Sequence, residues 1–117
     1  MNKRSKGSEW ELKAGEFLSR HGIQVLEYNF RCKIGEIDIV GTDGKFLIFF
    51  EVKYRSSNKY GYAVEAVNKK KQSVILKVSD YYRITHNISP IQSVRYDVVA
   101  IENNIIKWIP GAFGYSG

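Results

Sequence analysis

Two acidic residues and a lysine stand at a spacing that suits metal-dependent chemistry. Asp38 lies in one apolar segment and Glu51-Val52-Lys53 lies in the next, with the turn-forming dipeptide Asp43-Gly44 between them. Carboxylate oxygens are the ligands that Mg²⁺ and Mn²⁺ prefer, whereas zinc favours nitrogen and sulfur ligands. The pattern therefore predicts a site for a hard divalent cation, with Asp38 and Glu51 as ligands and an ammonium group beside them.

The length of the turn decides which side chains meet. If the turn has two central residues, Asp38 lies opposite Phe49 on the next strand. Glu36 then lies opposite Glu51. Asp38 and Glu51 become diagonal neighbours on one face, with Cα atoms about 7–8 Å apart. Lys53 shares that face. The other face carries only apolar side chains: Ile37, Ile39, Ile48, Phe50 and Val52.

Facing carboxylates need a partner. Like charges across two strands destabilise the pair, and burial would drive one of the carboxyl groups towards protonation. A cation between them removes both costs. The alternative is that Glu51 and Lys53 form a surface ion pair worth less than about 1 kcal/mol. Neither His21 nor His86 stands at a metal-ligand spacing from another candidate, which argues against zinc.

The elements that must position these residues begin with a helix. Ser8 and Glu11 form a capping-box pattern, and the helix is expected to end at Gly22. Residues 1–7 are basic and are expected to form an arm ahead of it. The apolar residues that recur at helical spacing are Trp10, Ala14, Phe17 and Leu18.

Five strands and a second helix follow. The expected strands are residues 23–30, 36–40, 46–54, 94–101 and 105–109, and the expected helix is 64–83. Its core-facing residues are Val67, Val74, Ile75, Val78 and Tyr82. The order is α-β-β-β-α-β-β. Because a helix crosses between the third and fourth strands, the sequence predicts a single α/β domain with a mixed sheet flanked by helices.

Length and charge narrow the function classes. The chain has 117 residues, enough for one domain, and 18 Lys and Arg against 12 Asp and Glu give a net charge of +6. This excess favours a polyanionic partner such as nucleic acid, an anionic membrane surface or an acidic protein. No apolar run is long enough to span a membrane or to follow the basic start as a secretory signal. Only one cysteine occurs, so we expect a cytoplasmic protein without disulfides.

The basic residues are clustered. Three consecutive lysines, residues 69–71, fall in the first turns of the second helix, where the helix dipole disfavours cations. An anion is therefore expected nearby, and a solvated helix face is the alternative. Residues 53–62 interleave cations with tyrosines, which suits phosphate contacts and stacking on unpaired bases, although such tyrosines also serve as packing residues. The candidate nucleic-acid contacts are Arg31, Lys33, Arg55, Lys69, Lys70 and Lys71.

These motifs resemble a known group of enzymes. The sequence GEIDIV at 35–40, followed by EVK at 51–53, resembles the core of the PD-(D/E)XK nuclease superfamily, although Ile37 stands where the superfamily's name has proline. More narrowly, the chain is similar to the YraN-like family of small bacterial proteins, relatives of archaeal Holliday junction resolvases. The further matching segments are residues 15–16, 49–55, 61, 65–67, 71–72, 95–101 and 112–113.

The resemblance covers nearly the whole chain and implies a restriction-endonuclease-like fold with metal-dependent nuclease activity. It implies an endonuclease selective for branched or junction DNA. Asp38, Glu51 and the Val52 carbonyl would hold Mg²⁺ or Mn²⁺, and Lys53 would stabilise the developing negative charge.

Two further residues enter through the same resemblance. Glu16 on the first helix would complete the metal site, and Gln72 would lie near the phosphate or the attacking water. For Glu16 the alternative is a solvated ion pair with Lys13 or Arg20, which stand three and four residues away. Glu36 is a secondary candidate for the site, and the alternative for it is an ion pair with Arg31 or Lys33.

Two rival functions remain open. The first is a nucleic-acid-binding module on the same fold that does not cleave; the intact set of Asp38, Glu51 and Lys53 argues against it. The second is an interaction protein for an acidic partner, which leaves the paired carboxylates unexplained. Symmetric cutting of a four-way junction would require a homodimer, and the sequence leaves the oligomeric state open.

Overall fold

The computed structural model describes residues 6–55 and 68–114, and the remainder of the chain lies outside it. The elements are α1 (Lys6–Arg20), β1 (Gln24–Arg31), β2 (Glu36–Thr42), β3 (Leu47–Arg55), α2 (Lys69–Thr85), β4 (Val94–Glu102) and β5 (Ile105–Phe113). The strands form one sheet in the order β1-β2-β3-β4-β5, in which β3 and β4 are parallel and the other neighbours are antiparallel. The predicted order and the mixed α/β fold of a single domain are confirmed.

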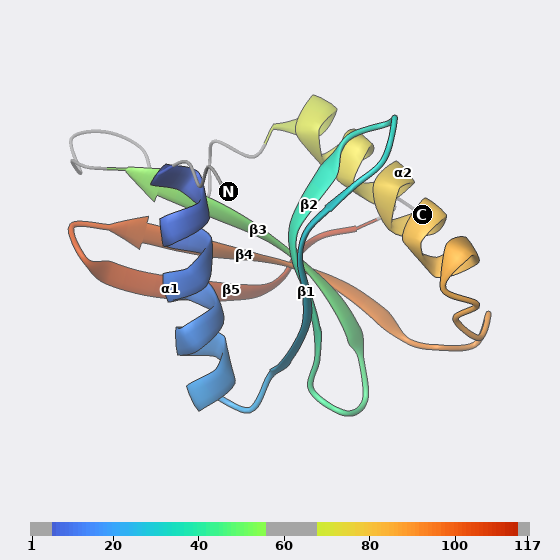
Figure 1. Cartoon of the computed structure of the whole chain (residues 1–117), viewed down its shortest axis with the longest axis horizontal. Helices are drawn as coiled ribbons and strands as arrows, with labels where there is room; N and C mark the ends of the chain where they lie inside the picture. Colours follow the sequence, from blue (N-terminus) through green and yellow to red (C-terminus); the bar gives the residue numbers. More distant parts are fainter. Residues whose placement is uncertain (1–5, 56–67, 115–117) are drawn as a thin grey trace, which may run out of the picture.

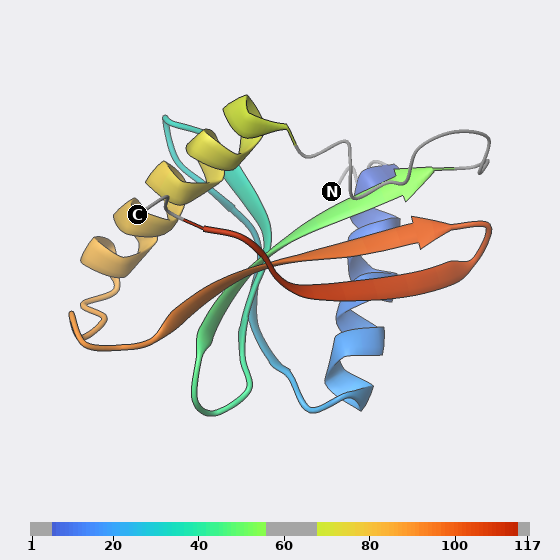
Figure 2. The same cartoon turned by 180° about the vertical axis from the view of Figure 1, so that it is seen from behind.

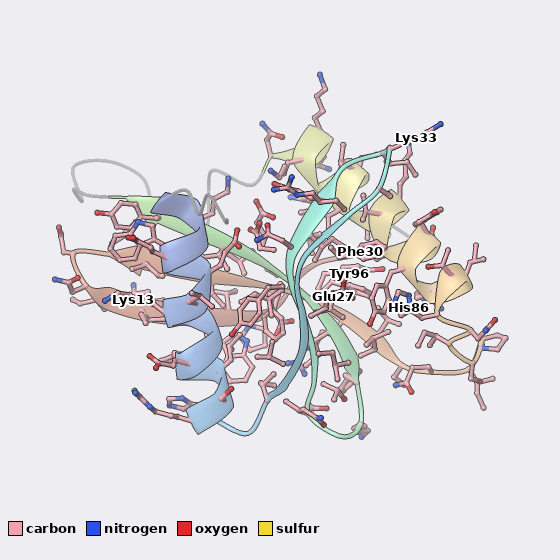
Figure 3. All side chains as sticks on the ribbon, in the orientation of Figure 1. Lys13, Glu27, Phe30, Lys33, His86 and Tyr96 are labelled. Atoms are coloured by element: carbon pink, nitrogen blue, oxygen red, sulfur yellow. The ribbon has the colours of Figure 1, made fainter. Side chains whose placement is uncertain are left out.

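The two helices lie on opposite faces of the sheet. Figure 1 shows α1 in front of the strands, and the reverse view in Figure 2 brings α2 to the front. Each helix buries its own apolar cluster. The α1 cluster contains Ala14, Leu18, Ile23, Ile39, Ile48, Phe50, Val99 and Ile101. The α2 cluster contains Phe30, Ile37, Val40, Leu47, Phe49, Ile75, Val78, Tyr82 and Tyr96, and Figure 3 shows Phe30 and Tyr96 between the sheet and α2.

Both helices begin elsewhere than predicted. Because α1 begins at Lys6, Ser8 lies inside the helix, so the capping box is wrong and the last two residues of the expected arm are helical. Helix α2 begins at Lys69, where the side chain of Asn68 caps it by accepting a hydrogen bond from the Lys71 amide at 2.9 Å. Among the described residues, neither helix is long and apolar enough to cross a membrane.

The turn between β2 and β3 is wider than predicted. Thr42 pairs with Leu47, so four residues lie between the strands. The Asp43 carboxylate holds this wider turn by accepting hydrogen bonds from the amides of Lys45 and Phe46 at 2.9 and 2.8 Å. The predicted register is therefore wrong: each residue of β2 pairs with the β3 residue two positions later than predicted. The error is even, so along the ladder from Ile39 to Thr42 each side chain stays on its expected face of the sheet.

The predicted apolar face of β2 is also wrong at one residue. Ile37 pairs with Phe30 and packs in the α2 cluster, whereas Ile39 pairs with Tyr28 and packs in the α1 cluster. Between Tyr28 and Phe30, Asn29 has a φ of 53°, which interrupts the alternation of side chains along β1. The neighbouring strand follows this change, so β2 contributes apolar side chains to both faces.

A buried acidic residue ties the far end of this hairpin to the rest of the sheet. Asp97 of β4 is fully buried and accepts hydrogen bonds from Nε and Nη2 of Arg95, both at 2.9 Å, from Nε1 of Trp108 at 2.8 Å and from the Gly111 amide at 2.9 Å. Nη1 of Arg95 lies 3.7 Å from Oδ2 of Asp43 in the β2–β3 turn. The network joins β4, β5 and the turn, and β5 runs on to Phe113, beyond the predicted end at residue 109.

We expect Asp97→Asn to lower the free energy of unfolding by about 2–4 kcal/mol, because Arg95 loses its buried counter-charge and the new amide group faces other donors. Urea denaturation followed by circular dichroism measures the change. Asp80→Asn is the matched control, since Asp80 forms a partly exposed pair with Arg83 at 3.6 Å and its loss should cost less than about 1 kcal/mol. Equal losses in the two variants would contradict a dominant role for Asp97.

Candidate functional site

The candidate site lies where β2 and β3 separate. Their ladder runs from the pair Thr42 and Leu47 to the pair Ile39 and Phe50. One position further along β2, Oδ2 of Asp38 accepts a hydrogen bond from the Val52 amide at 2.8 Å. A side-chain oxygen thus takes the place of a backbone acceptor. The first turns of both helices and the carboxyl end of β3 lie at the same end of the molecule (Figures 1 and 2).

Asp38 interacts with two other carboxyl groups here. Asp38 and Glu51, which are 9% and 4% exposed, are in hydrogen-bonding contact with each other, and Asp38 is also in contact with Glu11 of α1. Burial raises the pKa of Asp38 to about 7, against the Val52 amide, which lowers it. Burial and then the charge of Asp38 raise the pKa of Glu51 to about 7. The charged forms of Asp38 and Glu51 are disfavoured together, so both carboxyl groups take up protons at a higher pH than ordinary carboxyl groups do.

Two lysines face the same carboxylate oxygen. Nζ of Lys53 lies 3.6 Å from Oε2 of Glu51, and Nζ of Lys71 lies 3.3 Å from it. Desolvation alone would lower the pKa of Lys71, but the Glu51 carboxylate raises it above its usual value. The anion expected beside the first turn of α2 is therefore Glu51, and Lys71, predicted only as a nucleic-acid contact, belongs to the site.

A cavity of about 360 Å³ opens on this cluster. Its volume is within the range of ligand-binding pockets in proteins. The cavity is lined by Trp10, Glu11, Asp38, Glu51, Val52, Lys53 and Tyr54. Asp38, Glu51, Val52 and Lys53 of the predicted metal centre thus border one space, and they are joined there by residues of α1.

The glutamate that α1 contributes is not the expected one. Glu16 is exposed and does not line the cavity, whereas Glu11 does. Glu11 stands three and seven residues before Ala14 and Leu18, so it shares their buried helix face. Its carboxylate also accepts a hydrogen bond from Asn29 at 2.6 Å. Helical spacing alone could have identified Glu11, but the capping-box interpretation assigned it another role.

The remaining predicted residues lie around the site rather than in it. Glu36 forms an exposed ion pair with Arg31, with Nε and Oε1 3.0 Å apart. Lys33 points outwards from the tip of the connection between β1 and β2 (Figure 3). Gln72 is half-buried on α2 and is not among the residues that line the cavity.

Lys69 and Lys70 are exposed in the first turn of α2. Arg55 ends β3, and its side chain lies outside the described part, as does Val67. The exposed cations among the candidate nucleic-acid contacts therefore lie on two segments: the end of β1 with its connection to β2, and the start of α2.

The donors suit a hard cation. Among the described residues, no three His, Cys, Asp or Glu side chains surround one point as metal ligands. Asp38 and Glu51 provide two carboxylates in contact, with pKa values raised by burial, so that a cation replacing the shared protons would restore both charges. Such an oxygen-only pair fits Mg²⁺ or Mn²⁺, which retain several water ligands, and does not fit zinc.

The fold and the site define a class: a small α/β protein that holds a buried carboxylate pair, flanked by lysines, at the end of its central strand. The chain belongs to the family described as "Uncharacterised protein family UPF0102", whose model matches residues 10–101. This is the YraN-like family that the motifs resemble, and the matched range contains every residue of the cavity.

Its relatives match along nearly their full lengths. The UPF0102 protein of Lachnoclostridium phytofermentans is 38% identical over 117 residues, which cover 100% of this chain and 99% of the relative. That of Caldicellulosiruptor bescii is 42% identical over 111 residues, covering 92% and 93%. That of Fusobacterium nucleatum is 39% identical over 109 residues, covering 93% and 91%.

The raised pKa values predict an unusual pH dependence of stability. Because folding raises the pKa of Asp38 and Glu51 from ordinary values of 3.8 and 4.5 to about 7, their protonated forms favour the folded state. This contribution is complete below about pH 4 and is lost as the pH rises to about 7. In a chelator, Asp38→Asn should therefore be more stable than the wild type at pH 8 by about 1–3 kcal/mol, with little difference at pH 4.

Urea unfolding between pH 4 and pH 8 measures this difference. Glu16→Gln, which changes an exposed glutamate of the same helix that carries Glu11, should follow the wild type at every pH. An Asp38→Asn protein less stable than the wild type at pH 8 would show that the carboxylate pair does not oppose folding.

Proposed function

We propose that this protein is a metal-dependent nuclease that hydrolyses phosphodiester bonds, with Asp38 and Glu51 as the ligands of Mg²⁺ or Mn²⁺. The observation that supports it most is the buried contact between these two carboxyl groups, with an ammonium group 3.6 Å from one of them. Packing alone gives no reason to bury two acids side by side. A bound divalent ion supplies that reason and the chemistry at once.

A bound ion would lower the pKa of a coordinated water and neutralise charge on the phosphate. The side chains of Asp38 and Glu51 would position the ion. The Val52 amide holds the Asp38 carboxylate in one orientation, and Glu51 approaches from the neighbouring strand. The Val52 carbonyl is the third oxygen that we assign to the ion. Ion binding would displace protons from this pair, and Glu11, which is in contact with Asp38 and has a pKa raised by burial, is placed to take one of them up.

The two lysines supply positive charge for the phosphate. Both now neutralise one oxygen of Glu51. A cation bound to Glu51 would weaken this pairing, and Lys53 and Lys71 could then face the extra negative charge of the transition state. Lysine suits this role because its ammonium is a compact charge on a flexible stem.

The substrate class follows from charge and from the motif resemblance. The net charge is +6, and exposed cations lie at the connection before β2 and at the start of α2. Such contacts bind phosphates without reading sequence. Together with the likeness of the motifs to junction resolvases, they support branched or junction DNA as the substrate. Symmetric cutting of a junction would need a homodimer. The single cysteine favours a cytoplasmic location.

A cleavage assay tests the proposal. Labelled four-way junction, flap and single-stranded DNA are incubated with Mg²⁺ or Mn²⁺ and each purified variant. Asp38→Asn and Lys53→Ala should each slow cleavage by about 100-fold or more, because each removes a group that stabilises the transition state. Glu16→Gln, outside the cavity, should keep the wild-type rate. Equal cleavage by all variants would reveal a contaminating nuclease and contradict the proposal.

Two further results separate the rival functions. Binding to DNA without cleavage under either metal would favour a nucleic-acid-binding module. A salt titration of the affinity for duplex DNA should give a slope of log K against log salt of about −0.9 for each phosphate contacted. A slope near zero would favour an acidic protein partner instead.

A further inference from the structure

An aromatic pair stands at the wall of the acidic cavity. The rings of Trp10 on α1 and Tyr54 on β3 are stacked, with centroids 3.9 Å apart and planes inclined by 12°. Both residues line the cavity that contains Asp38 and Glu51. The pair therefore borders the space in which the proposed function places the scissile phosphate.

The tyrosine keeps a free surface in this arrangement. Trp10 covers one face of its ring, yet Tyr54 remains 41% exposed. On the tryptophan, Nζ of Lys13 lies 5.7 Å from the ring centroid, and Figure 3 shows Lys13 projecting from α1. The stack thus combines a cation near the tryptophan with an exposed tyrosine ring. Proteins that bind single-stranded nucleic acid use such cations and exposed aromatic rings to contact phosphates and bases.

We propose that Tyr54, supported from behind by Trp10, is a stacking platform for one unpaired nucleobase next to the scissile phosphate, which a cation bound by Asp38 and Glu51 would hold. This inference rests on the proposed nuclease function and narrows its substrate. A base inside a duplex has both faces covered by its neighbours, so only a nucleotide without a stacked partner can use the platform. The substrate class is DNA with an unpaired nucleotide at the cleavage point, as in a flap or at a branch.

A packing role is the competing explanation. Trp10 also packs against the α1 cluster, so the ring pair helps to hold α1 on β3. Packing predicts an effect of Tyr54 on stability alone. A stacking platform predicts an effect that depends on whether the nucleotide carries a base, and this can be tested with the wild-type protein.

The first experiment changes only the DNA. A nicked duplex with a one-nucleotide flap is prepared with a normal base and with an abasic flap, and wild-type affinity is measured by fluorescence anisotropy in a chelator. The abasic flap should bind about tenfold more weakly, because base–aromatic stacking is lost. A ribonucleotide flap with the same base should bind as the deoxyribonucleotide does, since the platform contacts the base. Equal affinity for the normal and abasic flaps overturns the proposal.

The second experiment changes the ring. Tyr54→Phe keeps the aromatic face and should bind the normal flap as the wild type does, whereas Tyr54→Ala should bind it about tenfold more weakly and show no further loss with the abasic flap. A 2-aminopurine flap base should be quenched on binding to the wild type and Tyr54→Phe but not to Tyr54→Ala. Equal losses for both flaps in Tyr54→Ala would indicate packing alone and overturn the platform.

Failure of this inference and failure of the proposed function give different results. All binding is measured without divalent ions, so it does not depend on hydrolysis. Metal-dependent cleavage combined with equal binding of the normal and abasic flaps overturns the platform and keeps the nuclease. Base-dependent binding without cleavage under either metal keeps the platform and overturns the nuclease.

Discussion

Two carboxyl groups in contact inside a protein are an unfavourable arrangement, and the candidate site depends on how this chain tolerates one. Asp38 and Glu51 are each at least 90% buried by surface area, and burial raises the pKa of both to about 7. The Val52 amide, Lys53 and Lys71 offset part of the cost. Natural proteins accept such local instability mainly at functional sites, where a ligand reverses it. A divalent ion between the carboxylates would replace their mutual repulsion with attraction of both groups to the ion.

The rest of the fold holds the pair in place from a distance. The two carboxylates lie on neighbouring strands of a hairpin whose ladder stops at Ile39 and Phe50, and the hydrogen bond from the Val52 amide to Asp38 links the strands beyond that point. The network around Asp97 anchors the turn at the other end of that hairpin. Each helix packs on its own face and sends one charged side chain to the site, Glu11 from α1 and Lys71 from α2. The site is thus assembled from one hairpin, β2 and β3, and from the two helices that lie on opposite faces of the sheet.

Sequence patterns could predict the elements and the meeting of Asp38 with Glu51, because strand alternation has a period of two and survives an even error in register. They could not predict the turn length, which the Asp43 carboxylate sets through hydrogen bonds to two amides. They also missed the change of face at Ile37, since nothing in its own strand signals the positive φ of Asn29. Helical spacing was enough to predict that Glu11 lies on the buried face of α1. The pairing of Lys71 with Glu51 could not be predicted in this way, because it depends on where α2 begins.

If the carboxylate pair is a cation site, it should bind Mn²⁺. Anomalous scattering from crystals soaked in Mn²⁺ tests this most directly. We expect one manganese peak between Asp38 and Glu51, at about 2.0–2.2 Å from an oxygen of each. The Lys53 and Lys71 ammonium groups should move away from Oε2 of Glu51. Saturating Mn²⁺ that leaves this position without a peak, with both lysines still paired to Glu51, would contradict the account.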